Sequence, residues 1–322
     1  MRPKSFAVVF VILAMNLLSL KYPTKSAHAS AAAANPFFSE STLPFHAPPF
    51  DKIKDDDYAP AIEEGMKNQL AEIEAIANNP AAPTFANTLE AMERSGALLT
   101  RVSKVFFNLT TANTSDTLQK IKADEAPKLA AHSDAIFLNA KLFARVKALY
   151  DSRDSLKLDP ESHYLVERYF KAFVRAGALL SESDKETLRG LNQEEAKLTT
   201  KFEDDVLAET NNGAVVIDNK ADLEGLSEND IAAAVELAKE RKLDGKWVIA
   251  LQNTTQQPAM TFLKNRAVRE RLFQASVSRG NHGGENDTKA IVARLAQLRP
   301  QRAKLLGYPD HATFTLDDQM AK

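Results

Sequence analysis

The 322-residue sequence contains no cysteine. This absence excludes disulfide bonds, metal sites with cysteine ligands, a thiol nucleophile and a lipid-modified N-terminal cysteine. Because disulfide-free proteins are also common in oxidising compartments, the absence is compatible with a bacterial periplasm.

The chain also lacks a strong excess of charge of either sign. It carries 41 Lys and Arg residues against 43 Asp and Glu residues, which gives a formal net charge of −2. Phosphate backbones are bound by concentrated basic faces, so this even balance argues against a nucleic-acid partner.

Long apolar runs are missing except near the N-terminus. There, Arg2 and Lys4 precede the run 6–20, and a small-residue site, Ala27-His28-Ala29, follows. A membrane-spanning helix needs roughly 20 apolar residues, so this layout is more typical of a cleavable secretory signal. We therefore predict a signal peptide at 1–29, a periplasmic or secreted location, and no membrane association after cleavage.

Residues 30–56 are predicted to form an extended arm, because four prolines (Pro36, Pro44, Pro48 and Pro49) disfavour helix there. We expect the phenylalanines of this arm to pack on the body of the protein. The remaining region, 57–322, is predicted to be helical.

Apolar residues at steps of three and four predict a succession of helices along that region. They are expected at 58–77, 85–109 with Thr84 as the N-cap, 115–150 with a bend near Pro127, 160–180, 183–208, 227–242, 259–278, 287–306, and from 311 to the end. Two short β-branched stretches, 214–218 and 247–251, predict strands. The expected fold class is all-α, with one minor β-strand pair.

Three stretches of the chain resemble one known family. They are FANTLEAMERSG at 85–96; LEGLS at 223–227 with GKWVIAL at 245–251; and RERLFQA at 269–275 with AKLLGY at 303–308 and LDDQMA at 316–321. Together they resemble the thimet oligopeptidase and peptidyl-dipeptidase family of zinc metallopeptidases. Asn35-Pro36-Phe37 and the predicted signal peptide favour the bacterial peptidyl-dipeptidase branch, which releases dipeptides from peptide C-termini.

This resemblance implies a helical body divided by a deep channel that admits oligopeptide substrates. It also implies zinc held by two histidines of a His-Glu-x-x-His helix and a downstream glutamate, with the motif glutamate activating the metal-bound water. None of the six histidines here is followed by glutamate, and no two lie four residues apart. Catalytic, cofactor-binding and metal residues are therefore expected to be absent from this chain.

We accordingly expect the chain to be the N-terminal, non-catalytic portion of such a peptidase and to be inactive alone. Its helices would form one wall of the channel, and zinc would be bound by a missing C-terminal catalytic half. The sequence stops within a helical pattern after Met320, which suggests truncation. The alternatives are a standalone periplasmic helical peptide-binding or interaction protein and, less favoured, intrinsic hydrolase activity from another site.

The isolated polar motifs have structural interpretations. His132 is expected in the core, and His163 and His311 near helix starts are expected to cap or to face solvent. The glycine-rich stretch 280–284 follows a predicted helix, so it indicates a helix connection and not a phosphate-binding loop.

Acidic residues that are adjacent in sequence are also expected to be structural. The run 55–57 suits a helix N-terminus better than a calcium loop, because it lacks the glycine and the distal glutamate of an EF-hand. The pairs Glu194-Glu195 and Asp204-Asp205 are expected to form a solvated face.

Overall fold

The computed structural model describes residues 35–320, so the predicted signal peptide lies outside the described residues. The α-helices are α2 (Tyr58–Ala77), α3 (Ala91–Arg94), α4 (Ala97–Ala112), α5 (Asp116–Phe137), α6 (Ala140–Ser152), α7 (Pro160–Arg175), α8 (Glu182–Asn212), α9 (Glu228–Glu240), α10 (Asn253–Phe262), α11 (Arg266–Val277), α12 (Lys289–Leu305) and α13 (His311–Leu316). Strands β1 (Val215–Ile217) and β2 (Trp247–Ile249) pair antiparallel, with Val216 opposite Val248. The predicted fold class, all-α with a minor strand pair, is confirmed.

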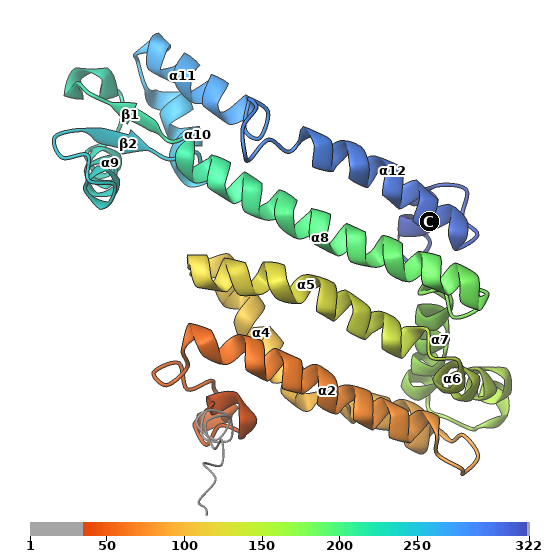
Figure 1. Cartoon of the computed structure of the whole chain (residues 1–322). Coiled ribbons are helices and arrows are strands. Elements are labelled where there is room, and N and C mark those ends of the chain that lie inside the picture. Colours follow the sequence, from red (N-terminus) through yellow and green to blue (C-terminus); the bar gives the residue numbers. More distant parts are fainter. Residues whose placement is uncertain (1–34, 321–322) are drawn as a thin grey trace, which may run out of the picture.

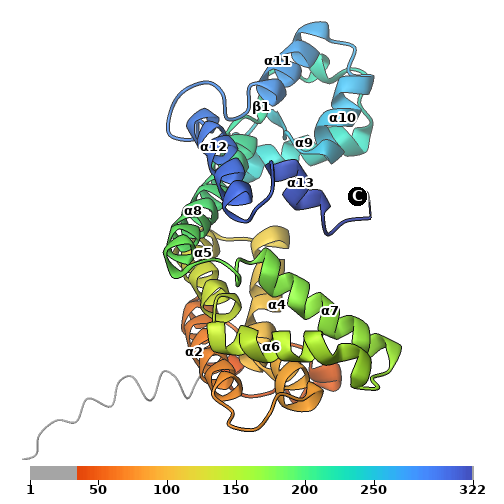
Figure 2. The same cartoon turned by 90° about the vertical axis from the view of Figure 1, so that its right-hand side faces the viewer.

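Four long helices form a row that organises the molecule. Helices α2, α5, α8 and α12 lie side by side in that order (Figure 1), and each packs on its neighbour. The two strands with α9, α10 and α11 lie at one end of α8, whereas α6 and α7 lie near the other end. Seen along its edge, the row carries α4, α6, α7 and α13 on one side (Figure 2).

Three separate apolar clusters hold these parts together. One surrounds Phe173 of α7, which is fully buried and stacks on Phe143 of α6. A second lies between α2 and α4, where the rings of Tyr58 and Phe106 are 5.3 Å apart. The third packs the strand pair on α10 and α11, with Leu272 fully buried. Burial of such side chains contributes roughly 1.5–3 kcal/mol each, so each cluster stabilises its own set of elements.

The prediction of one helix over 85–109 is wrong, because the chain turns at Gly96. Thr84 does cap the start: its hydroxyl accepts the Asn87 N–H at 3.1 Å, and Asn87 returns the bond. A π-helical turn, η4 (Ala86–Glu90), leads into α3. Gly96 then adopts φ 73° and donates its N–H to Glu72, and α4 begins as a separate helix. Left-handed backbone favours glycine, which explains the break.

Two other predicted helices are also divided, at asparagines that cap the following helix. The region 115–150 separates into α5 and α6, since Asn139 accepts the Leu142 N–H at 3.0 Å. Pro127 lies inside α5 without ending it. The region 259–278 separates into α10, which already begins at Asn253, and α11, which Asn265 caps. An asparagine side chain competes for backbone N–H groups, so it starts a helix more readily than it continues one.

The described part of the arm is only partly packed on the body. It contains the 3-10 turns η1 (Pro36–Phe38), η2 (Pro44–His46) and η3 (Asp55–Asp57). Phe37 is buried against Tyr58, as predicted, but Phe45 and Phe50 are exposed, so the expectation that they pack on the body is wrong. Within residues 35–320, no helix has the length and apolar character that crossing a membrane requires.

Candidate functional site

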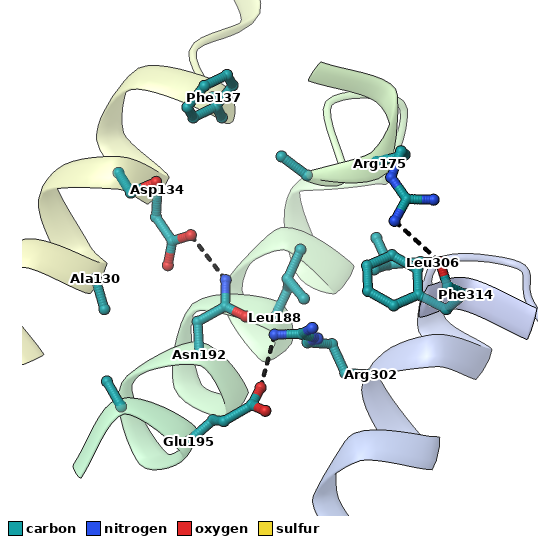
Figure 3. Close-up of a pocket in the computed structure, with 13 residues that line it drawn as sticks. Ala130, Asp134, Phe137, Arg175, Leu188, Asn192, Glu195, Arg302, Leu306 and Phe314 are labelled. Carbon is teal, nitrogen blue, oxygen red and sulfur yellow. Dashed lines mark hydrogen bonds and ion pairs between the residues drawn. The ribbon is translucent and has the colours of Figure 1, made fainter. Parts of the chain in front are cut away.

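One cavity of about 370 Å³ lies where five helices meet (Figure 3). Helices α5, α7, α8 and α12 contribute to it together with α13, which lies across one side. The lining residues are Ala130, Ser133, Asp134, Phe137, Arg175, Ala176, Leu188, Asn192, Glu195, Ala196, Arg302, Leu306 and Phe314. Because its lining residues lie between positions 130 and 314, the local sequence pattern does not indicate this cavity.

Helix α8 contributes two polar side chains to the cavity, Asn192 and Glu195. Asn192 and Glu195 are three residues apart and therefore share one face of the helix. Asn192 donates from Nδ2 to Asp134 Oδ1 of α5 at 2.7 Å, while Glu195 accepts from Arg302 of α12 at 2.6 Å. Helix α8 thus connects both neighbours through one polar face.

Asp134 is the buried acid of the cavity, with 8% of its surface exposed. Its Oδ2 has no hydrogen-bond partner among the described residues. Burial raises the pKa of this carboxyl, and the Asn192 hydrogen bond with the charges of Arg189 and Arg302 only partly opposes that shift. The neutral form is therefore favoured more strongly than at the surface.

The acids of α8 do not form the solvated face that the sequence predicted. Glu195 is 15% exposed and accepts from Arg299 Nε at 3.0 Å as well as from Arg302. Glu194 binds Arg294 of α12 through both of its carboxylate oxygens, at 2.6 and 2.7 Å. The correction has a simple cause: helical periodicity does not reveal that α12 places arginines opposite these acids.

The second acidic pair of α8 departs from that prediction in the same way. Asp204 accepts from Lys122 of α5 at 3.1 Å, and Asp205 is buried beside Lys201 at 2.8 Å. Ion pairs therefore join α8 to both of its neighbours in the row.

Arg175 of α7 holds α13 over the cavity. Its Nη2 donates to the carbonyl of Phe314 at 2.9 Å, and its guanidinium carbon lies 4.5 Å from the centre of that ring. Its Nη1 pairs with Asp317 at 2.9 Å, and Arg168 pairs with Asp318 through both of its terminal nitrogens. These contacts join the last described helix to α7.

His132 lies in the core as predicted, whereas Asp159 and Asp310 cap α7 and α13, and His163 and His311 are half-buried and do not act as caps. His132 is buried and its Nε2 lies 2.8 Å from Gln69 Oε1; burial lowers its pKa, which favours the neutral ring. His163 lies in the first turn of α7, 3.1 Å from Asp154, and His311 is the first residue of α13.

The glycine-rich stretch 280–284 connects α11 to α12, as predicted. Glu209 of α8 fixes it, accepting from the Gly280 N–H at 3.2 Å and lying 2.8 Å from His282 Nε2. The loop therefore serves the packing of α8, α11 and α12.

Residues 35–320 do not provide a zinc site. Among them, no group of three His, Asp or Glu side chains is arranged to hold a metal ion. The donor set of these residues does not fit zinc. The cavity is lined by one buried acid, two arginines and apolar side chains together with the half-buried Glu195.

Comparison with known proteins finds similarity to peptidases. Residues 259–322 match peptidase family M3. The chain is 49% identical over 288 residues to the dipeptidyl carboxypeptidase of Escherichia coli (strain K12), and 48% identical over 290 residues to that of Salmonella typhimurium. These matches cover 89% and 90% of the chain but only 42% and 43% of the relatives. The organellar oligopeptidase A of Arabidopsis thaliana is 29% identical over 90% of the chain and 36% of its own length.

Proposed function

We propose that this chain belongs to peptidase family M3 and forms a non-catalytic channel wall of a secreted zinc peptidyl-dipeptidase. The substrate would be an oligopeptide, and the product a dipeptide released from its C-terminus. The name of the two relatives that are almost half identical to this chain supports this choice of reaction.

One observation supports a non-catalytic role: the chain spans less than half the length of those relatives, and its sequence contains no His-Glu-x-x-His. We propose that the zinc ligands and the general base belong to the part of the relatives that this chain does not match. The residues described here would then restrict access to the channel by their shape.

The exposed surface of α10, α11 and α12 supports an interface with such a part. Large apolar side chains are at least half exposed on α10 and α11, namely Phe262, Phe273 and Val277, and Val292 of α12 is almost as exposed. Apolar side chains gathered on neighbouring elements are typical of surfaces that another protein segment covers. The proposed location, the periplasm, rests on the pattern of residues 1–29 alone.

A hydrolysis assay on this chain alone tests the proposal. The chain is incubated with zinc and an oligopeptide that has a free C-terminus, and mass spectrometry measures released dipeptides, with the Escherichia coli dipeptidyl carboxypeptidase as positive control. We expect no release by this chain. Dipeptide release that a chelator abolishes would contradict the proposal and favour intrinsic hydrolase activity.

Size-exclusion chromatography and dye binding address the standalone alternative. A wall with an uncovered interface is expected to self-associate and to bind a hydrophobic dye. A monodisperse chain that unfolds cooperatively and binds no dye would favour the helical binding module instead.

A further inference from the structure

One segment of the arm, residues 41–50, places apolar side chains in solvent. Phe45 is fully exposed, and Leu43 and Phe50 are 44% and 59% exposed. The segment has the sequence STLPFHAPPF and contains no Lys, Arg, Asp or Glu, although these residues make up 26% of the whole chain. Aromatic side chains with few charges around them are typical of the core of a protein interface.

The backbone of this segment is strained at the most exposed side chain. Phe45 has φ 58° and ψ 20°, and His46 has φ 54°, so two consecutive residues other than glycine adopt the left-handed region. Bulky residues rarely adopt this region, and the exceptions cluster at functional sites. Burial does not offset the strain here, because the Phe45 side chain is fully exposed in this chain.

Hydrogen bonds within the segment hold the strained bend. Ser41 Oγ donates to the Ala47 carbonyl at 2.6 Å and accepts from the Leu43 N–H at 3.2 Å. Nδ1 of His46 lies 3.0 Å from the Ser41 carbonyl, and the His46 N–H donates to the Leu43 carbonyl at 3.0 Å. Three prolines of the segment restrict its backbone further. The exposed side chains are therefore presented in a fixed arrangement, which reduces the entropy lost when a partner binds.

The segment lies at the same end of the helical row as α10 and α11. The arm leads into α2 at Tyr58, and α9, α10 and α11 follow the end of α8, so both groups lie at that end (Figure 1). Neighbouring packed helices lie about 8–10 Å apart, so the row of four is roughly 30 Å across, about the diameter of a small domain. The part of the two dipeptidyl carboxypeptidases that this chain does not match is more than half of their length. It is therefore large enough to cover α10 and α11 and to reach the segment as well.

We propose that residues 41–50 form a docking turn that inserts Phe45 into an apolar pocket of the part of the peptidase that this chain does not match. The inference rests on the proposed function, which assigns such a further part to the protein. Phe45 is the central anchor of the turn, and Leu43 and Phe50 extend the apolar contact around it. The partner surface is apolar at this point, because the turn offers no Lys, Arg, Asp or Glu for a charged surface to pair with.

Oxidative footprinting read by mass spectrometry tests the docking turn in two proteins. One is this chain alone, and the other is a fusion in which this chain replaces the matching part of the Escherichia coli dipeptidyl carboxypeptidase. We expect rapid oxidation of Phe45 in the chain alone. In the fusion, its rate should fall to that of Phe37, the buried phenylalanine of the same arm.

Each other outcome of the footprinting has a definite meaning. An unchanged Phe45 rate in a fusion that releases C-terminal dipeptides would overturn the docking turn and leave the proposed function intact. A fusion that releases no dipeptide would overturn both. Protection of Phe45 that grows with the concentration of this chain alone would identify a second copy as the occupant and overturn the choice of partner.

Two substitutions of Phe45 separate docking from folding. Phe45→Ser removes the anchor, whereas Phe45→Leu keeps an apolar side chain and is the matched control. In this chain alone neither substitution should lower the melting temperature, because the side chain is fully exposed. In the fusion, Phe45→Ser should lower the melting temperature by about 2 °C or more, and Phe45→Leu should lower it less. Equal melting temperatures for the parent fusion and both variants would contradict the proposal.

Discussion

The contact of Glu195 with α12 should contribute much of the attachment between α8 and α12. This carboxylate is 15% exposed and accepts from both Arg299 and Arg302, at 3.0 and 2.6 Å. Replacing Glu195 by glutamine keeps the shape and removes the charge. Both arginines would then face a neutral amide in a place where water replaces the lost interaction poorly.

The expected loss of unfolding free energy is about 2 kcal/mol, since a hydrogen bond to a charged group contributes about 1.5–3 kcal/mol. The matched control is Glu194→Gln on the same helix. Glu194 is 39% exposed and binds Arg294 alone, so solvent and salt screen its ion pair. The control should therefore lose less stability, and its loss should diminish as salt is added.

Urea denaturation followed by far-UV circular dichroism measures both variants at low and high salt. We expect a lower midpoint for Glu195→Gln at both salt concentrations, with the slope unchanged. Equal losses in the two variants, or a Glu195 effect that salt abolishes, would refute the claim that burial makes this contact strong.

Three further predictions concern pH and backbone conformation. Burial raises the pKa of Asp134 in the folded protein, so the stability that its protonated form contributes is complete below the unfolded pKa and is lost as pH rises through the raised value. Urea denaturation across pH should therefore find Asp134→Asn more stable than the parent protein at neutral pH and equal to it in acid. Burial lowers the pKa of His132 in the folded protein, so the stability that its neutral ring contributes is present above the unfolded pKa and is lost as pH falls through the lowered value. In the same measurement, His132→Gln should lose less stability than the parent protein as pH falls. Gly96→Ala should lower the free energy of unfolding by about 1–3 kcal/mol, because a Cβ there would lie 2.5 Å from the Gln69 side chain. Gly283→Ala is the control: it has a similar φ, its Cβ would meet no atom of the described chain within 4 Å, and thermal denaturation should show a smaller loss.

The sequence predicts the helices better than their interruptions. Helix α2 begins and ends where its apolar stripe does, at Tyr58 and Ala77. The breaks at Gly96 and Asn139 were missed because the apolar period continues across them. Both residues are recognisable boundary signals, a glycine for left-handed backbone and an asparagine for an N-cap, so more weight on these signals would have found the breaks.

Pairing between helices distant in sequence could not be predicted. Glu195 and Arg302 are 107 positions apart, and nothing in the local pattern of α8 indicates which helix faces it. The burial of Asp134 has the same origin, since only the packing of α5 on α8 removes that carboxyl from water. The cavity and its charges therefore became apparent only in three dimensions.

The most direct test of the central claim, that this chain is the wall and not the catalyst, is a domain exchange. This chain replaces the part of the Escherichia coli dipeptidyl carboxypeptidase that it matches, and release of C-terminal dipeptides is measured with and without a zinc chelator. The account predicts chelator-sensitive release by the fused protein, and none by this chain or by the remaining Escherichia coli part alone. Release by this chain alone, or full activity of the remaining part without any wall, would contradict it.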